Sequence, residues 1–482
     1  MKNKIFISIL LLAASLVPYS CTDVLEEEVY SELSDSYLKT ESGLNTVLYS
    51  TYSSFNATGF TLVNDYFISV YMSGIGYGKG GTWETGTAVA FQTYTWDSNS
   101  GYFGTTWSNN FTSIRNANIL LDKISVEDAD YSDNYRKLIT AEAKGIRGAS
   151  YAILFNHFGP TPIFTTTETT DLELPRATEQ EMLSRIETDL TEAAADLPVE
   201  PAQYGRMCKG GALGFLCKHY LNTHQWQKAA DAAQQIMALG YYSLQANYLD
   251  AFGVLHEGHS NNPEVIWANP ADAANSPEFF MALGYPTDFP LPLPSQGTWA
   301  TRTYLYDSFL DSFEENDTRL GGIVTSYVSK QTGQTVVGYG ENHSLPVKFG
   351  FDPNAVAFMS GIDLPRIRYS DILLARAEAL NEINGPNDEA IDLINMVRTR
   401  AGISSLSAGD FNKESLRDQI LEERFHEFYF EGKEREDLKR QGKLISDAVS
   451  RGVNAKDYQV LFPIPQAEID ANTNINENNS GY

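Results

Sequence analysis

Apolar side chains recur at spacings of three and four over several long stretches of the chain, the periodicity of helices with one buried face. The stretch from 133 to 158 shows it most clearly, with Ile139, Ile146 and Ile153 on one face. A second stretch, 179–197, stops at Pro198, a residue that cannot continue a helix. We therefore expect a helix over each stretch and a mainly helical protein.

A pair of shorter helices is expected next. Residues 209–221 and 225–239 have helical periodicity, and small alanines of the second stretch lie opposite the large side chains Tyr220 and Trp226. Antiparallel helices that approach closely need such small residues. The pair resembles a tetratricopeptide unit, in which a large residue precedes a short turn and alanines follow it.

A second pair is expected near the C-terminus. Residues 367–384 and 388–401 are separated by Gly385-Pro386, which interrupts a helix, and a single long helix is expected over 413–432. The two pairs lie much farther apart than one repeat length. The pattern therefore predicts a helical scaffold with insertions and not a continuous solenoid.

Two regions lack helical periodicity and predict loops. Residues 240–365 hold ten of the nineteen prolines, and residues 74–86 hold six glycines. Within the first region, 323–328 and 335–339 flank a turn at Thr332-Gly333 and predict a β-hairpin. Binding residues concentrate in loops carried by a rigid scaffold, so these two regions are the candidate ligand side.

The N-terminus has the pattern of an export signal. Residues 1–20 begin with two lysines and continue with a short apolar stretch, and Cys21 follows directly. A signal that ends at a cysteine resembles that of a bacterial lipoprotein, in which the cysteine carries the lipid. An ordinary secretory signal is the alternative. Cys208 and Cys217 would lie about 13 Å apart along one helix, too far for a disulfide, so we expect two buried thiols.

The composition adds a strongly acidic balance. The 482 residues include 62 Asp and Glu against 35 Lys and Arg, a formal net charge of -27. Because Lys and Arg contacts to phosphate dominate nucleic-acid affinity, this balance argues against a nucleic-acid partner. It suits a neutral ligand or a basic partner.

Several connected motifs of the C-terminal third bear a family resemblance. They are LPRIRYSDILLARAEALNEING at 364–385, IDLINMVRTRAGI at 391–403, LRDQILEERFHEFYFEGKEREDLKRQGKL at 416–444 and LFPIPQAEIDANTNINENNSGY at 461–482. Together with FTSIRNANILLDKI at 111–124 and AEAKGIRGASYAILFNHFGPTPIF at 141–164, they resemble the SusD/RagB family of outer-membrane lipoproteins. The resemblance covers nearly the whole chain after the signal.

The resemblance implies a fold, a location and a partner. The fold would be mainly α, a scaffold of tetratricopeptide-like helix pairs with a loop-rich insertion carrying short strands and hairpins. We expect one body over 21–482, with scaffold mainly at 30–55, 105–240 and 364–445, ligand-side loops at 60–104 and 240–363, and a tail at 458–482. Family members are lipid-anchored at the cell surface, capture glycans or other nutrients without hydrolysing them, and pass them to a SusC-like TonB-dependent transporter.

The charged residues of the C-terminal motifs are interpreted as structural. Arg376 and Glu378 are expected to be solvated or capping charges, and Arg424 is expected to pair with Glu427 or Glu431 at helical spacing. A catalytic set drawn from the glutamates of this helix is disfavoured, because acids on one exposed helix face lack the apolar surroundings that raise a pKa.

Aromatic residues in the two loop regions are the candidate glycan contacts. A sugar ring has an apolar face that lies flat on an aromatic ring, while its hydroxyls need polar partners. Trp83, flanked by glycines, is the strongest candidate. The full candidate set is Trp83, Tyr77, Tyr71, Trp96, Trp299, Tyr285 and Tyr304, with Arg302 and Asn275 as polar partners. Trp107 and Trp226 are expected in the helical core.

No cofactor or catalytic motif emerges. Gly76, Gly78 and Gly81 match a dinucleotide motif only by count, because no helix is expected to open after them. The sequence requires no cofactor, and a structural calcium ion held by loop carbonyls would leave no motif. Three functions stay open from the residues: a glycan-binding lipoprotein that serves a transporter, a surface glycan-processing enzyme, and an adhesion or assembly protein that holds another polypeptide. A non-glycan nutrient or a peptide stays open as the alternative ligand.

Overall fold

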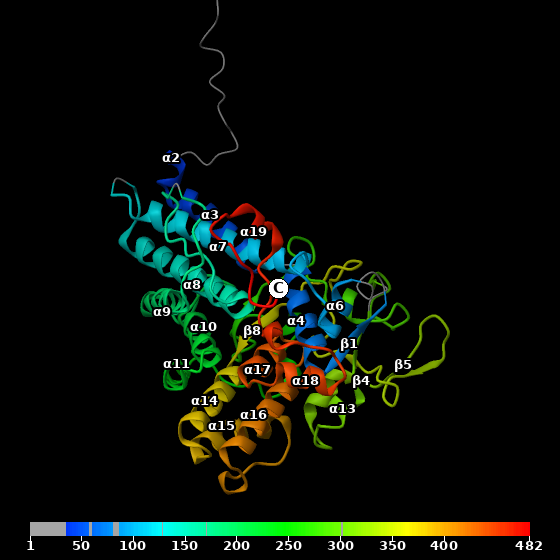
Figure 1. Ribbon diagram of the computed structural model, residues 1–482. Coiled ribbons are helices and arrows are strands. Elements are labelled where there is room, and N and C mark those ends of the chain that lie inside the picture. Colours follow the sequence, from blue (N-terminus) through cyan, green and yellow to red (C-terminus); the bar gives the residue numbers. More distant parts are fainter. Residues whose placement is uncertain (1–34, 57–59, 81–85, 128, 170, 300–301) are drawn as a thin grey trace, which may run out of the picture.

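The computed structural model describes residues 35–56, 60–80, 86–127, 129–169, 171–299 and 302–482 (Figure 1). The predicted signal, Cys21 and Trp83 lie outside these residues. The described chain is mainly helical with small two-stranded sheets, as the sequence predicts. Figure 1 shows the long helices on one side of the molecule and the loop-rich segments with the short strands on the other.

Helices of the N-terminal half pack in chain order. Their bounds are α3 (Glu41–Asn56), α7 (Gly101–Ile124), α8 (Asp133–Phe158), α9 (Glu179–Asp196), α10 (Lys209–Asn222) and α11 (Trp226–Ala238). Neighbours contact one another along this series, and α11 then packs against the C-terminal block. The expected helices at 133–158, 179–197, 209–221 and 225–239 are thus confirmed to within a few residues.

Local sequence explains where these helices begin and end. Ser132 caps α8 by accepting a hydrogen bond from the Tyr135 amide. Thr178 and Glu181 form a reciprocal capping box at the start of α9. The chain leaves α9 in an extended conformation at Leu197, directly before Pro198.

The C-terminal block is also helical. It contains α14 (Tyr369–Asn384), α15 (Asp388–Ala401), α16 (Lys413–Phe428), α17 (Glu434–Arg440), α18 (Leu444–Ser450) and α19 (Gln466–Ala471). Two boundaries differ from expectation. Ile367 belongs to strand β8 (Leu364–Arg368), where Pro365 disfavours a helix, and α16 ends at Phe428 because Phe430 adopts a positive φ of 61°.

The loop-rich side is built from short elements. They are α4 (Phe60–Ser73), β1 (Gly76–Lys79), α6 (Thr87–Thr93), β2 (Val265–Asn269), α12 (Phe280–Gly284), β3 (Arg302–Leu305), α13 (Asp307–Leu310), β4 (Ile323–Val324), β5 (Ser326–Val328), β6 (Thr335–Val337) and β7 (Leu345–Pro346). The short helix α2 (Asp35–Leu38) instead packs against α3 on the helical side. The predicted hairpin is confirmed as the antiparallel pair β5–β6. The expectation of loops over 60–104 misses α4, a helix that packs against α17.

The interior contains more than one buried apolar cluster. Cys208 and Cys217 are buried free thiols, and Trp107 is 3% exposed, all as predicted. A second apolar cluster joins α4 and the end of α16 to the loop-rich side, with Phe67, Phe280 and Phe430 in mutual ring contact. The loops therefore rest on the scaffold through packed aromatic rings.

Close packing around α10 yields a first prediction. A Cβ added at Gly210 would stand 2.6 Å from ring carbon Cε2 of the buried Tyr242. We expect Gly210→Ala to destabilise the fold by about 1–3 kcal/mol, because the ring has to move. Gly104→Ala is the matched control, since nothing lies within 4 Å of its Cβ position on α7, and should stabilise by about 0.5–1 kcal/mol. Urea unfolding compares the two; equal effects would contradict this packing.

Candidate functional site

Three aromatic side chains form a continuous stack on the loop-rich side. The Trp299 ring lies between Phe279, at a centroid distance of 5.5 Å, and Phe358, at 5.2 Å. Trp299 and Phe279 are half-buried, and Phe358 is 37% exposed. We call these three residues the aromatic ledge. It offers partly exposed ring faces of the kind that contact a sugar ring.

Backbone contacts hold the ledge in place. Phe358 sits on a tight turn in which Val356 and Met359 exchange two backbone hydrogen bonds, and Ala357 has a positive φ of 53°. The Gly297 amide donates to the Ala357 carbonyl at 2.8 Å. A Cβ at Gly297 would stand 2.9 Å from the Phe358 ring, so this close approach requires glycine.

The segments beneath the ledge are also tied together. The Trp299 amide donates to the Ala282 carbonyl of α12 at 2.9 Å, and Glu278 pairs with Ser360 through two backbone hydrogen bonds. Asp352 accepts the Gly361 amide at 2.7 Å. Three segments distant in the sequence, around 278–284, 296–299 and 352–361, therefore meet at the ledge.

Asn275 lies in an exposed turn that precedes Phe279 by four residues. Its side chain donates to Asp272 Oδ1 at 2.8 Å, and Asp272 and Ser276 close the turn with paired backbone hydrogen bonds. The turn presents a carboxylate and an amide to solvent. Polar groups with this chemistry can accept and donate hydrogen bonds to sugar hydroxyls.

A second aromatic group lies on the β1–β3 sheet. Tyr77 is directly opposite Tyr304, and its ring stacks on Tyr306 at 5.1 Å. Burial raises the pKa of the Tyr77 hydroxyl to about 12, which keeps it protonated and able to donate a hydrogen bond at neutral pH. The backbone of Arg302 pairs with Lys79 on the same two strands. Tyr77 is half-buried and Tyr304 is 8% exposed.

Like Tyr304, three further candidates are buried. Tyr71 is 2% exposed and its hydroxyl bonds Thr303 Oγ1 at 2.8 Å, while Trp96 is 6% exposed and donates to Tyr482 Oη at 2.9 Å. Tyr285 is 1% exposed and stacks on Phe289. Their rings belong to the core that supports the loops. Phe279 and Phe358 were not among the candidates from the sequence. Their only sequence signal is that both are aromatic residues of the proline-rich region.

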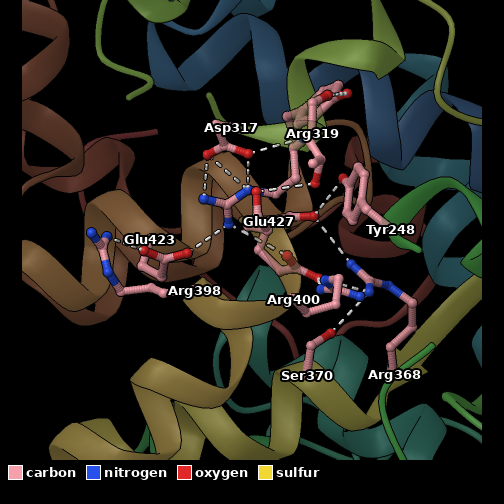
Figure 2. Close-up of polar contacts among 12 residues, drawn as sticks. Tyr248, Asp317, Arg319, Arg368, Ser370, Arg398, Arg400, Glu423 and Glu427 are labelled. Carbon is pink, nitrogen blue, oxygen red and sulfur yellow. Dashed lines mark hydrogen bonds and ion pairs between the residues drawn. The ribbon is translucent and has the colours of Figure 1, made fainter. Parts of the chain in front are cut away.

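Beneath the loops lies a buried network of charged side chains (Figure 2). Arg368 is fully buried and contacts Glu264, Glu427 and Glu431, the last through two bonds of 2.8 Å. Its guanidinium thus joins the end of β8 to α16 and to the loop before β2. We refer to the connected charges around Arg368 as the ionic core.

A second buried arginine extends the ionic core. Arg319 binds Asp317 at 2.7 Å and Glu423 at 2.6 Å, and Glu423 also accepts from Arg398 at 2.9 Å. Figure 2 shows Arg319 approaching α16 from the loop-rich side. Since Arg319 belongs to the insertion and Glu423 to the scaffold, these ion pairs fix the loops to the helices.

The ionic core corrects several sequence interpretations. Glu423, Glu427 and Glu431, expected on an exposed face of the helix at 413–432, are at most 3% exposed. Arg424 pairs with Asp371 and Asp437 and not with the glutamates of its own helix. The sequence shows helical spacing but not the cations that other segments bring to that face.

The neighbouring motif needs the same correction. Glu378, expected in solvent or at a cap, is fully buried and binds Arg440 at 2.7 Å. Arg376 is half-buried, binds Glu389 at 2.5 Å and donates to the Ala230 carbonyl. The glutamates of this region are therefore paired with cations and hold the scaffold together.

Among the described residues, no group of three or more His, Cys, Asp or Glu side chains is placed to hold a metal ion. Within the same part of the chain, no helix combines the length and the apolar character needed to cross a bilayer.

Comparison with known proteins assigns the family. Residues 302–482 match the SusD family, and residues 23–221 match a family described as starch-binding and associating with the outer membrane. The chain belongs to the SusD/RagB family. The resemblance seen in the sequence motifs is thereby confirmed. The description of the second family concerns starch binding and association with the outer membrane.

Individual relatives agree with this assignment. A SusD-like protein of Formosa agariphila is 29% identical over 425 residues, 78% of this chain and 79% of its own length. The starch-binding protein SusD of Bacteroides thetaiotaomicron is 24% identical, covering 71% of this chain and 72% of its own. A solved laminarin-binding SusD-like protein superposes with a TM-score of 0.78 at 23% identity, over 92% of this chain and 100% of its own. The last likeness confirms the SusD-like fold.

Proposed function

We propose that this SusD-like protein captures an oligosaccharide at the cell surface and delivers it to a SusC-like TonB-dependent transporter. The observation that carries the proposal is the aromatic ledge of Phe279, Trp299 and Phe358, partly exposed on loops fixed by the scaffold. An acidic chain suits a neutral ligand, which needs no positive charge for recognition.

The ledge explains how such a ligand would be bound. The apolar face of a sugar ring stacks on Trp299 or Phe358. Its hydroxyls accept hydrogen bonds from the Asn275 amide and donate to the Asp272 carboxylate on the adjoining turn. Tyr77 and Tyr304 on the β1–β3 sheet are kept as further candidate contacts. So are Arg302 and Trp83; the structure does not describe the Arg302 side chain, and Trp83 lies outside the described residues.

The signal pattern of residues 1–20 and the cysteine that follows it support the proposed location. Acylation of Cys21, after removal of residues 1–20, would anchor the protein in the outer membrane with the ligand-binding loops exposed at the surface. An anchored receptor beside a transporter raises the local concentration of captured ligand at the entrance to the transporter. The chain itself then needs binding and release but no catalysis.

The second prediction concerns the aromatic ledge. Trp299→Ala and Phe358→Ala should each weaken binding of the cognate glycan at least about tenfold, because each removes a stacking surface at the centre of the site. Affinity electrophoresis against a panel of purified polysaccharides identifies the glycan, with laminarin and starch as the first probes because relatives are named for binding them. Isothermal titration of the variants then gives the fold-change.

Tyr49→Ala is the matched control for this experiment. Tyr49 is an aromatic residue of helix α3, 54% exposed and far in sequence from the ledge. Its replacement should leave both affinity and thermal stability unchanged. Full-strength binding by both ledge variants would remove the ledge from the site, and the absence of retardation by every glycan would overturn the proposed function.

A further inference from the structure

A groove separate from the aromatic ledge opens beside α16. It has a volume of about 640 Å³ and lies between α16, α13 and the residues that follow α4. None of the ledge residues lines it. We propose that this groove is a second oligosaccharide-binding site, used together with the ledge on longer glycans. This inference rests on the proposed glycan-binding function.

The floor of the groove is apolar and partly aromatic. Phe309, Phe411 and Phe425 line it together with Ile75 and Leu421. Phe411 and Phe425 are half-buried, so parts of both rings reach the surface of the groove. Like the rings of the ledge, these rings offer flat faces on which the C–H groups of a sugar can stack.

Polar side chains with hydrogen-bonding capacity line the same groove. Asp418 and Glu422 stand one turn apart on α16, both exposed, and the Gln419 amide between them donates to Glu422 at 3.3 Å. Three serines, at 308, 312 and 415, also line the groove. Carboxylates and amides accept and donate the bidentate hydrogen bonds that pairs of sugar hydroxyls make.

The only ionisable nitrogen in the described lining is a neutral one. The lining includes no Lys or Arg, and burial lowers the pKa of His426 to about 3. Ser312 donates to the Phe309 carbonyl at 2.7 Å, so the 2.8 Å contact between Ser312 and His426 Nε2 has the imidazole as donor. Lys443 stands beside the lining but is paired with Asp418 at 2.5 Å, and the described lining itself has no Lys or Arg to hold an anion such as phosphate or sulfate.

The lining of the groove beside α16 differs from that of another surface groove of similar size. That groove has a volume of about 670 Å³ along α9, is lined by Arg176 and Arg185, and has no aromatic side chain among its described lining residues. Size alone therefore does not mark a sugar site. The groove beside α16 combines ring faces with carboxylate, amide and hydroxyl groups, which is the combination that carbohydrate recognition requires.

Two sites on one molecule have a measurable consequence. A glycan long enough to reach both would bind more tightly than a short one, since the second contact is made at high effective concentration. A short oligosaccharide would instead occupy both sites independently. We expect a stoichiometry of two for short oligosaccharides of the glycan that the protein binds.

The test uses the purified full chain and isothermal titration with that short oligosaccharide. Phe411→Ala and Glu422→Gln should each reduce the stoichiometry from two to one and weaken binding of the parent polysaccharide at least about tenfold. Glu422→Gln keeps the side-chain volume and leaves the core intact, so its result does not depend on folding. Glu414→Gln, on the first turn of α16 outside the groove, is the control and should keep two sites.

The outcomes separate this inference from the proposed function. With Trp299→Ala, one site should remain, and that site should disappear when Glu422→Gln is added. A single site in the unaltered chain that neither groove variant affects would overturn the second site and leave the proposed function standing. Binding of a Lys-rich peptide at the groove, with no sugar bound there, would also overturn it. No binding of any glycan would instead refute the proposed function itself.

Discussion

Replacing Arg368 with methionine is expected to destabilise the folded protein by about 3–5 kcal/mol, because it leaves buried carboxylates without their main counter-charge. Glu264, Glu427 and Glu431 all contact this guanidinium, and none is more than 3% exposed. Arg400 and Lys348 neutralise part of the remaining charge, at 2.6 Å from Glu427 and 2.7 Å from Glu431. They cannot replace the bidentate contact to Glu431.

Urea unfolding measures this effect as a lower transition midpoint with an unchanged slope. Arg368→Lys should recover part of the loss, because it restores the charge but not the fork geometry. Arg417→Met is the control. Arg417 lies on the same helix as Glu427 but is 30% exposed and pairs with Glu382, so its replacement should cost at most about 1 kcal/mol. Equal losses for the two arginines would show that the ionic core does not stabilise the fold.

The regular scaffold could be predicted from the sequence because its signals are local. The helix at Asp133–Phe158 and the helix at Asp388–Ala401 begin and end where periodicity, caps and glycines place them. The β5–β6 hairpin follows from two β-prone stretches around Thr332-Gly333. The strand at Leu364–Arg368 was missed since a short apolar run fits either a helix or a strand.

The environment of the charged helix could not be predicted because it depends on distant segments. Spacing along α16 shows which glutamates share a face, but Arg319 and Arg368 reach that face from residues 104 and 59 positions away from their partners Glu423 and Glu427. The aromatic ledge also depends on segments that are distant in the sequence. Trp299 could be proposed from its loop, whereas Phe279 and Phe358 join it only through tertiary packing.

The pH dependence of stability is expected to be shallow between about pH 5 and 7 and to fall steeply below about pH 4.5. Burial alone would raise the pKa of Glu427, but Arg400, Arg368 and Arg319 outweigh it and lower the pKa to about 2. Glu431 has a lowered pKa because Arg368 and Lys348 likewise outweigh its burial. An unfolded glutamate takes up a proton near pH 4.3, so these groups favour unfolding as the pH drops below that value.

At higher pH, buried histidines and buried carboxyls have opposite effects on the free energy of unfolding. Burial lowers the pKa of three histidines, so below pH 6.5 the unfolded chain binds protons that the folded chain does not, and stability falls. These are His157 and His426, each to about 3, and His219, to about 4. Burial raises the pKa of several carboxyls, which hold protons when folded, so stability rises as the pH falls toward 5. The largest of these shifts are those of Glu257, Glu278 and Glu434, to about 7, and of Asp65 and Asp363, to about 6.

Urea unfolding at a series of pH values tests this balance. Between about pH 5 and 7 the three histidines and the carboxyls with a raised pKa act in opposite directions, and below about pH 4.5 these carboxyls no longer compensate. Glu427→Gln should lower stability at pH 7 and weaken the acid dependence, because it removes one of the groups whose protonation drives unfolding. If this variant loses stability with acid as steeply as the unaltered protein, the ionic core is not the source of the acid sensitivity.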